Sequence, residues 1–258
     1  MKNREKIHPL DSYFCLQHFP TAWCPGCGIG IVLNSLLQAV AKCGLALKKD
    51  VLLLTSSLGC AGHTNEYLKT GVEVVSAEKL SLEAVGLKQK NASKKVVLLL
   101  SDADLFSCGL KKIFPQKIFK EELFCLYINS FLSQVFFLHK KLRRFPFQNQ
   151  KTEEDFFDLP EFMRRRGAVF TARWSQLHVR RLEFSMERAI QKKGFSFIEV
   201  LAPCLMYFSS DEQTGQKIER MRFFQTNCEI IHGGPSGSLG WPPKAKDIKI
   251  AVGNFIDY

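Results

Sequence analysis

The chain of 258 residues is 46% apolar and 24% charged, with a net charge of +11, which is ordinary for a soluble globular protein able to bury a substantial core. Its apolar runs are far too short to cross a bilayer, and no apolar segment follows the basic N-terminus, so we expect a cytoplasmic protein without membrane contact. Nine cysteines in such a protein argue against a disulfide framework and favour metal binding or buried thiols.

The first half of the chain alternates between helices and buried strands. After an irregular lead-in, the turn Cys24–Gly30 precedes a predicted helix at 29–43, where apolar residues recur on one face. An all-apolar strand is predicted at 51–55, because a strand without alternation is typical of burial on both faces. A helix at 80–89 and a second buried strand at 96–100 follow.

The second half continues this alternation. A helical stretch that Pro115 interrupts leads to a third buried strand, and residues 133–158 are predicted to form a long loop or insertion. The strands expected in this half lie at 123–128, 168–172 and 195–201, with helices beginning at Leu159 and spanning 182–192. Strand–helix–strand repetition predicts an α/β fold, with a mostly parallel sheet flanked by helices.

Three segments are expected along the chain. Residues 1–20 form the lead-in, residues 21–232 form the α/β domain, and residues 233–258 form a tail whose Gly- and Pro-rich part is predicted to be poorly ordered.

Basic residues gather in three clusters, His139–Arg144, Arg164–Arg166 and His178–Arg181. A solvated or subunit-facing surface is the simplest interpretation, and docking of an acidic electron carrier is a sharper one. Nucleic-acid binding is the least favoured, because no helix-turn-helix, RNP or zinc-finger pattern is present.

Four cysteines stand at positions where the predicted fold gathers loops. Cys24 and Cys27 form a C-x-x-C turn, Cys60 lies between glycines after the first strand, and Cys204 follows the last strand. The carboxyl ends of parallel strands share one edge of a sheet, so these thiols are expected to meet. Four thiolates suit either a [4Fe–4S] cluster or an all-cysteine zinc site. The other five cysteines are expected to be structural: Cys15, Cys43, Cys108, Cys125 and Cys228.

Several segments in the same order resemble the β subunit of 2-oxoacid:ferredoxin oxidoreductases. They are Trp23–Gly28, Gly59–Gly62 and Gly194–Cys204, with weaker likeness at Gly167–Arg173 and around Met221, so that the resemblance covers roughly residues 20–230. It implies a thiamine-diphosphate-binding fold, a partner α subunit with or without a γ subunit, and a [4Fe–4S] cluster on Cys24, Cys27, Cys60 and Cys204. It also implies oxidative decarboxylation of a 2-oxoacid to an acyl-CoA, with electrons leaving through the cluster to ferredoxin.

The resemblance also implies a diphosphate and Mg²⁺ site, with Asp102 and Asn129 as metal ligands. Hard oxygen ligands are what Mg²⁺ prefers. The cofactor-binding positions carried over are Gly59, Cys60, Ala61, Gly62, Asp102, Ala103, Asp104, Asn129 and Ser130. The chain departs from the family here: the motif Gly-Asp-Gly-Asp reads Ser101–Asp104, and Ser130 replaces an asparagine. Helix capping is the alternative role for Asp102 and Asp104.

His63 stands where the family carries a basic residue near the substrate carboxylate, a role that a protonated histidine can fill. A polar loop residue without a special role is the alternative. Three functions therefore compete. An active β subunit is favoured, a non-catalytic relative that keeps the cluster for structure or electron relay comes second, and a zinc-stabilised basic binding protein comes third.

Overall fold

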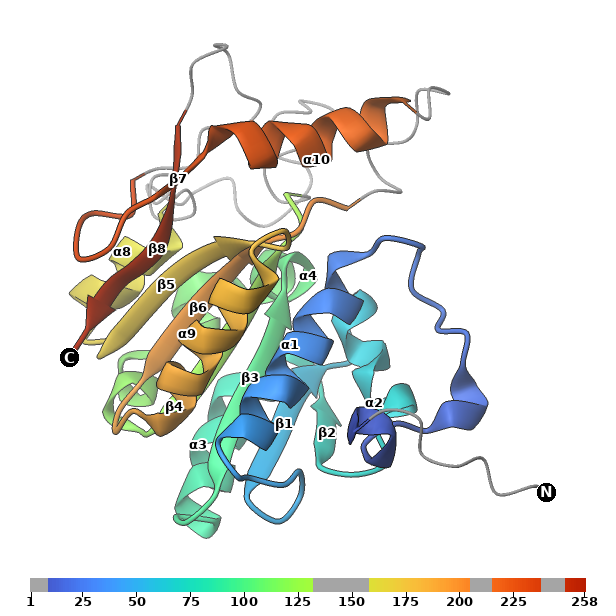
Figure 1. Cartoon of the computed structure of the whole chain (residues 1–258). Coiled ribbons are helices and arrows are strands. Elements are labelled where there is room, and N and C mark those ends of the chain that lie inside the picture. Colours follow the sequence, from blue (N-terminus) through green and yellow to red (C-terminus); the bar gives the residue numbers. More distant parts are fainter. Residues whose placement is uncertain (1–8, 132–157, 205–214, 238–248) are drawn as a thin grey trace.

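The computed structural model describes residues 9–131, 158–204, 215–237 and 249–258. In this part of the chain, one sheet runs in the order β2-β1-β3-β4-β6-β5-β8-β7 (Figure 1). The strands are β1 Val51–Ser56, β2 Val72–Val75, β3 Lys95–Ser101, β4 Leu123–Asn129, β5 Phe170–Ser175, β6 Ser196–Leu201, β7 Cys228–Ile230 and β8 Ile250–Asp257. From β2 to β5 every neighbouring pair is parallel, whereas β8 pairs with β5 in the antiparallel sense.

Helices cover both faces of the sheet (Figure 1). One face carries α1 Gly28–Lys42 and α9 Val179–Gln191, and the other carries α3 Leu80–Lys90, α5 Leu110–Ile113 and α8 Leu159–Arg165. The remaining helices are α2 Thr64–Tyr67, α4 Asp102–Cys108 and α10 Gly215–Asn227. Short 3₁₀ helices are η1 Pro9–Ser12, η2 Leu16–His18, η3 Cys60–His63, η4 Ala77–Lys79 and η5 Gln116–Lys120.

The apolar strands lie inside the protein, as their composition predicts. Every residue of β1, β4, β5 and β6 is buried. A strand covered by helices on both faces has no solvent side, so both sets of alternating side chains are largely apolar. The predicted fold class, a mostly parallel sheet flanked by helices, is confirmed.

The predicted elements differ from the observed ones in two neighbouring strands, β5 and β8. The strand predicted at 168–172 lies at Phe170–Ser175, and the expected tail includes the strand β8. Ser236 and Gly237, also in that tail, accept hydrogen bonds from buried Arg173 through their backbone carbonyls. The long segment 133–157 and the basic cluster His139–Arg144 lie outside the described residues, and the three-segment division stays a prediction.

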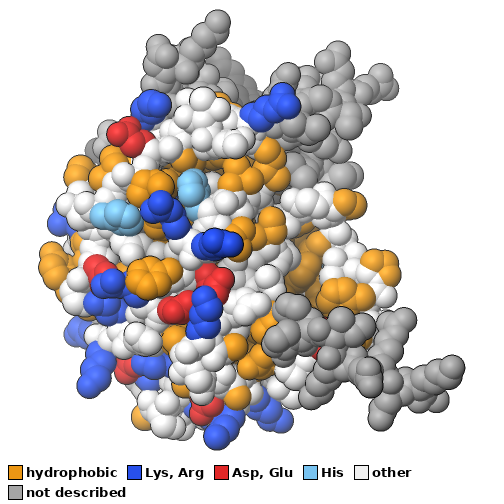
Figure 2. Space-filling view, viewed as in Figure 1, with side chains coloured by type: hydrophobic (Ala, Val, Ile, Leu, Met, Phe, Trp, Pro, Cys, Tyr) orange, Lys and Arg blue, Asp and Glu red, His pale blue; other side chains and the backbone are white. Residues whose placement is uncertain are grey.

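The surface on the α1 and α9 side mixes charges of both signs. Lys and Arg side chains alternate there with Asp and Glu and form no single positive field (Figure 2). Lys42 pairs with Glu183, and Arg188 pairs with Asp257. Among the residues described, no helix combines the length and the apolar character that a membrane crossing requires.

Candidate functional site

Four of the predicted site segments follow parallel strands at one edge of the sheet. The loop after β1 carries Cys60, the start of α4 after β3 carries Asp102, the turn after β4 carries Ser130, and the segment after β6 carries Cys204. The segments after β4 and β6 are joined by a backbone bond, with the Cys204 amide donating to the Ser130 carbonyl at 3.1 Å. In Figure 1, α10 crosses above this edge, where Phe224 packs against Phe131 with ring centroids 5.5 Å apart. The topology therefore gathers these segments as the sequence predicts.

Two of the four predicted ligand thiols, those of Cys27 and Cys60, have raised pKa values. Burial raises the pKa of the Cys27 thiol, and the neighbouring Cys60, Cys24 and Cys204 raise that pKa further. The pKa of the Cys60 thiol is likewise raised, first by burial and then by Cys204 and Cys24. Interactions of this kind need proximity, so the four thiols lie in one neighbourhood although the chain separates them widely.

A group of neighbouring sulfurs gains from positive charge. A cation would favour their thiolate forms and relieve the repulsion between them. Within the described part of the chain, no three His, Cys, Asp or Glu side chains come together as a ready site for a single metal ion. Around one zinc ion, tetrahedral Zn–S bonds hold sulfurs about 3.8 Å apart. A cubane cluster binds each thiolate at a different iron and so holds the sulfurs further apart than one zinc ion does.

Glycines and one tryptophan set the loop that carries Cys60. Gly59 has φ +64°, a conformation that favours glycine, and a Cβ there would lie 3.0 Å from the Cβ of Ala103. A Cβ on Gly62 would lie 2.7 Å from the carbonyl oxygen of Ser56. The Trp23 indole donates to the Cys60 carbonyl at 2.8 Å. This loop therefore packs against both the segment before α1 and the Ser101–Asp104 motif.

The carboxylate of Asp102 is held by several hydrogen-bond donors of the protein. The Asp102 carboxylate is 1% exposed and accepts from the Tyr127 hydroxyl, from the Ser130 amide at 3.0 Å and from the Ser130 hydroxyl at 2.5 Å. Octahedral Mg²⁺ with bonds of 2.0–2.1 Å separates adjacent ligand oxygens by about 3 Å. Because Asp102 and Ser130 already bring two oxygens to one point, they fit a hard cation after a small outward shift.

Asn129 does not join that pair. Its amide nitrogen donates to Glu199 Oε1 at 2.7 Å, and its amide oxygen accepts from the Phe131 backbone amide at 3.0 Å. The side chain is 2% exposed and serves the turn around it. Of the two metal ligands predicted from the sequence, only Asp102 lies beside another available oxygen, and that oxygen belongs to Ser130.

Asp104 has the capping role that the sequence offered as an alternative. Its carboxylate accepts from the Ser101 amide at 2.7 Å, from the Ser101 hydroxyl at 3.1 Å and from the Ser56 hydroxyl. Ser101 and Asp104 form a capping box at the start of α4. Burial nevertheless raises the pKa of the Asp104 carboxyl, and the hydrogen bonds only partly counter it. Asp104 therefore joins α4 to the end of β1.

His63 lies on the Cys60 loop but faces a carboxylate of its own chain. Its Nδ1 is 2.7 Å from Glu66 Oε1, and both side chains are about half exposed. This pairing occupies one ring nitrogen, so the role predicted for His63 stays a prediction.

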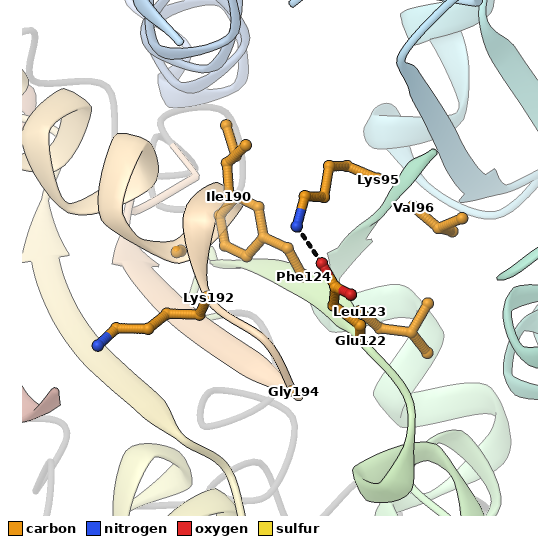
Figure 3. A pocket seen from close by; sticks show the side chains of 9 residues that line it. Lys95, Val96, Glu122, Leu123, Phe124, Ile190, Lys192 and Gly194 are labelled. Atoms are coloured by element: carbon orange, nitrogen blue, oxygen red, sulfur yellow. Dashed lines mark hydrogen bonds and ion pairs between the residues drawn. The ribbon is translucent and has the colours of Figure 1, made fainter. Parts of the chain in front are cut away.

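A small pocket lies at the opposite edge of the sheet and holds none of these residues. Figure 3 shows it between Phe124, Ile190 and Gly194, with Lys95 paired to Glu122 beside it. Its cavity of about 10 Å³ has room for at most about one water molecule. This pocket is too small for a cofactor or a 2-oxoacid.

Two buried charges escaped the sequence analysis. Arg173 on β5 and Glu199 on β6 are both 0% exposed and lie side by side, with Arg173 Nε donating to Glu199 Oε2 at 2.6 Å. Each stands inside an otherwise apolar strand, where an unpaired charge is very costly. Opposite charges in two strands that become neighbours are the signal that could have revealed the pair.

Comparison with known proteins places the chain near one group of enzymes. The curated 2-oxoglutarate synthase subunit KorB of Methanothermobacter marburgensis is 27% identical over 98% of this chain and 88% of its own length. KorB of Methanocaldococcus jannaschii is 28% identical over 97% of this chain and 93% of its own length. These two KorB proteins match nearly the whole chain. A 2-oxoacid:ferredoxin oxidoreductase subunit beta of Saccharolobus solfataricus is 28% identical over 72% of this chain and 62% of its own length.

A solved structure shares the fold. The 2-oxoglutarate:ferredoxin oxidoreductase from Magnetococcus marinus, solved with 2-oxoglutarate, coenzyme A and succinyl-CoA bound, matches 99% of this chain and 87% of its own with a TM-score of 0.72. At 16% identity this match concerns the fold alone. No protein-family model matches the chain.

Proposed function

We propose that this protein is the β subunit of a 2-oxoacid:ferredoxin oxidoreductase, acting with an α subunit in the CoA-dependent oxidative decarboxylation of a 2-oxoacid. The observation that carries the proposal is the group of four cysteines, Cys24, Cys27, Cys60 and Cys204, in which the thiol pKa values of Cys27 and Cys60 are raised by burial and then by the other sulfurs. Curated relatives over nearly the full length of the chain support it, since they are named as 2-oxoglutarate synthase subunits. A cytoplasmic location stays a prediction.

The four cysteines would hold a [4Fe–4S] cluster. Each is a free thiol, and none of the four residues is fully buried. The cluster would supply electron transfer to ferredoxin. The protein's own contribution is the turn around Cys24 and Cys27, the Cys60 loop fixed by Trp23, and the Cys204 segment tied to β4.

The neighbouring oxygen site would hold Mg²⁺ and the diphosphate of thiamine diphosphate, whose thiazolium supplies the carbanion chemistry of decarboxylation. Asp102 and Ser130 would bind the metal, and the Gly59–Gly62 loop would lie beside the diphosphate. Gly59 approaches Ala103 closely. This contact joins the thiol site to the oxygen site, which suits two groups that must exchange electrons.

The test is co-expression with the α subunit and anaerobic purification. We expect about four iron atoms per chain, a brown protein, and dye reduction that depends on both CoA and a 2-oxoacid. Colourless protein with one zinc per chain would contradict the proposal and favour a zinc-stabilised binding protein. Supplying 2-oxoglutarate, pyruvate and a branched-chain 2-oxoacid separately identifies the substrate.

A second function is favoured by the saturated state of the oxygen site. Every oxygen of Asp102 and Asn129 accepts a hydrogen bond from the protein, as expected of a chain that keeps the cluster for structure or electron relay without thiamine diphosphate. Calorimetry with thiamine diphosphate and Mg²⁺ separates the two functions. An iron-loaded complex that releases no heat at millimolar ligand would establish the relay.

A further inference from the structure

The turn that follows β4 is strained. Phe131 has φ +60°, which a bulky side chain rarely adopts, and its ring is 1% exposed. Such a conformation persists only when its surroundings over-determine it, and it concentrates at functional sites. Here the strain falls one residue after Ser130, whose amide and hydroxyl both reach Asp102. Whatever holds this turn also fixes the position of Ser130.

A continuous chain of buried polar contacts reaches the turn from the centre of the sheet. Arg173 Nε donates to Glu199 Oε2 at 2.6 Å, and Asn129 Nδ2 donates to Glu199 Oε1 at 2.7 Å. The Asn129 amide oxygen then accepts from the Phe131 amide at 3.0 Å. Glu199 and Arg173 are 0% exposed and Asn129 is 2% exposed, so water does not compete with these bonds.

The carboxylate fixes which way the Asn129 amide faces. Both oxygens of Glu199 accept, so Asn129 must present its nitrogen to Glu199 and therefore its oxygen to Phe131. With the amide reversed, two N–H groups would meet at Phe131 and two oxygens would meet at Glu199. Arg173 donates to Glu199 in this buried place, and Arg173 is itself held by the carbonyls of Ser236 and Gly237.

We infer that Glu199, oriented by Arg173, is a positioning residue for the oxygen site. Through Asn129 it holds the strained turn that places Ser130 against Asp102. The inference rests on the proposed function for its link to cofactor binding. The holding of the turn does not depend on that function.

The decisive variant is Glu199→Gln, examined in the complex with the α subunit. One oxygen of Glu199 becomes an NH₂ group, which faces a donor on Asn129 or on Arg173 and breaks one charged hydrogen bond. We expect amide hydrogen exchange at Ser130 and Phe131 to rise about tenfold or more. The concentration of Mg²⁺ that half-saturates thiamine-diphosphate binding should rise by a similar factor.

A compensating variant distinguishes positioning from general damage. In the double variant Glu199→Gln, Asn129→Asp the new NH₂ group meets a carboxylate, and the other carboxylate oxygen still accepts from Phe131. We expect exchange at the turn to return to within about threefold of the unaltered protein, because the donor and acceptor pattern is restored. Asp158→Asn is the matched control: it weakens the contact of Arg173 Nη2 with Asp158, 3.5 Å away, without touching Asn129. In Asp158→Asn, amide hydrogen exchange at Ser130 and Phe131 should change less than about twofold.

The possible negative results bear either on the role of Glu199 or on the catalytic function. Unchanged exchange at Ser130 and Phe131 in Glu199→Gln would overturn the inference, as would equal damage in the single and double variants. An unaltered complex that binds no thiamine diphosphate would overturn the catalytic function. The exchange measurement would still decide whether Glu199 holds the turn.

Discussion

The thiol site and the oxygen site lie at the same edge of the sheet but differ in how the protein satisfies them. The thiols of Cys24, Cys27, Cys60 and Cys204 are free, and burial, followed by the neighbouring sulfurs, raises the pKa values of Cys27 and Cys60. The carboxylate of Asp102, by contrast, is saturated by donors of its own chain. The first arrangement gains from a metal centre, whereas the second is already complete without one.

This difference shows what each site contributes to folding. Polar groups satisfied inside the protein stabilise it before any cofactor arrives, and removing one partner leaves the others buried and unpaired. Like groups that raise one another's pKa contribute little to folding until positive charge reaches them. The two sites should therefore respond in opposite ways when a single ligand is removed.

The largest effect is expected at the thiol site. Cys204→Ser should abolish the cluster, because a hydroxyl is a poor substitute for a thiolate on iron. We expect iron to fall from about four atoms per chain to well under half of that, with loss of the brown colour. The cluster-free stability should stay within about 0.5 kcal/mol of the cluster-free parent.

Cys108→Ser is the control for this variant, since Cys108 lies at the end of α4 and is not among the four predicted ligands. It should keep its full iron content. Full iron in Cys204→Ser would remove Cys204 from the ligand set, and with it the main support for the function proposed above.

The sequence determined the placement of these thiols more securely than their chemistry. Apolar runs such as 96–100 predict buried parallel strands, and strand order then forces the loops after them to one edge. The register of Tyr127 with Glu199 and of Glu199 with Arg173 depends on which strands become neighbours. No local sequence pattern shows which strands become neighbours, so neither the buried Arg173–Glu199 pair nor the orientation of Asn129 could be predicted.

Local conformation was the other feature that could not be predicted from the sequence. The motif at Ser101–Asp104 is compatible both with a diphosphate site and with a capping box, and the choice depends on Ser56 from another strand. The strand β8 was missed because its residues follow a Gly- and Pro-rich segment and it pairs with the distant β5. Predictions failed where a residue's partner comes from far away in the chain.

The second-largest effect is expected at the oxygen site. There the substitution should lower folding stability more than it lowers iron content. Asp102→Asn introduces an NH₂ group among the donors of Tyr127 and Ser130, so at least one buried donor loses its acceptor. We expect a loss of about 2–3 kcal/mol in the free energy of unfolding, measured by urea denaturation of the cluster-free protein. Iron content should fall less than in Cys204→Ser. Unchanged stability would show that the contacts of Asp102 contribute nothing to folding.

The smallest effect is a dependence on pH that follows from the same thiols. Burial, followed by the neighbouring sulfurs, raises the pKa of Cys27, so the folded protein holds this proton more tightly than the unfolded chain does. The resulting stability is fully present below the unfolded pKa, near pH 8.5–9, and is lost as pH rises toward the folded pKa.

Stability of the cluster-free protein should therefore fall from pH 8 to pH 10, with a slope of at most about 1.4 kcal/mol per pH unit for each proton involved. Cys27→Ser should flatten that slope. Reconstitution with iron and sulfide should show the opposite trend and improve as pH rises from 7 to 9, because ligation requires thiolates. Once the cluster is bound, the sulfurs have no proton to lose and the alkaline slope should shrink. A cluster-loaded protein with the same slope as the cluster-free one would mean that Cys27 stays a thiol beside the metal, and the two sites would no longer differ in the way described.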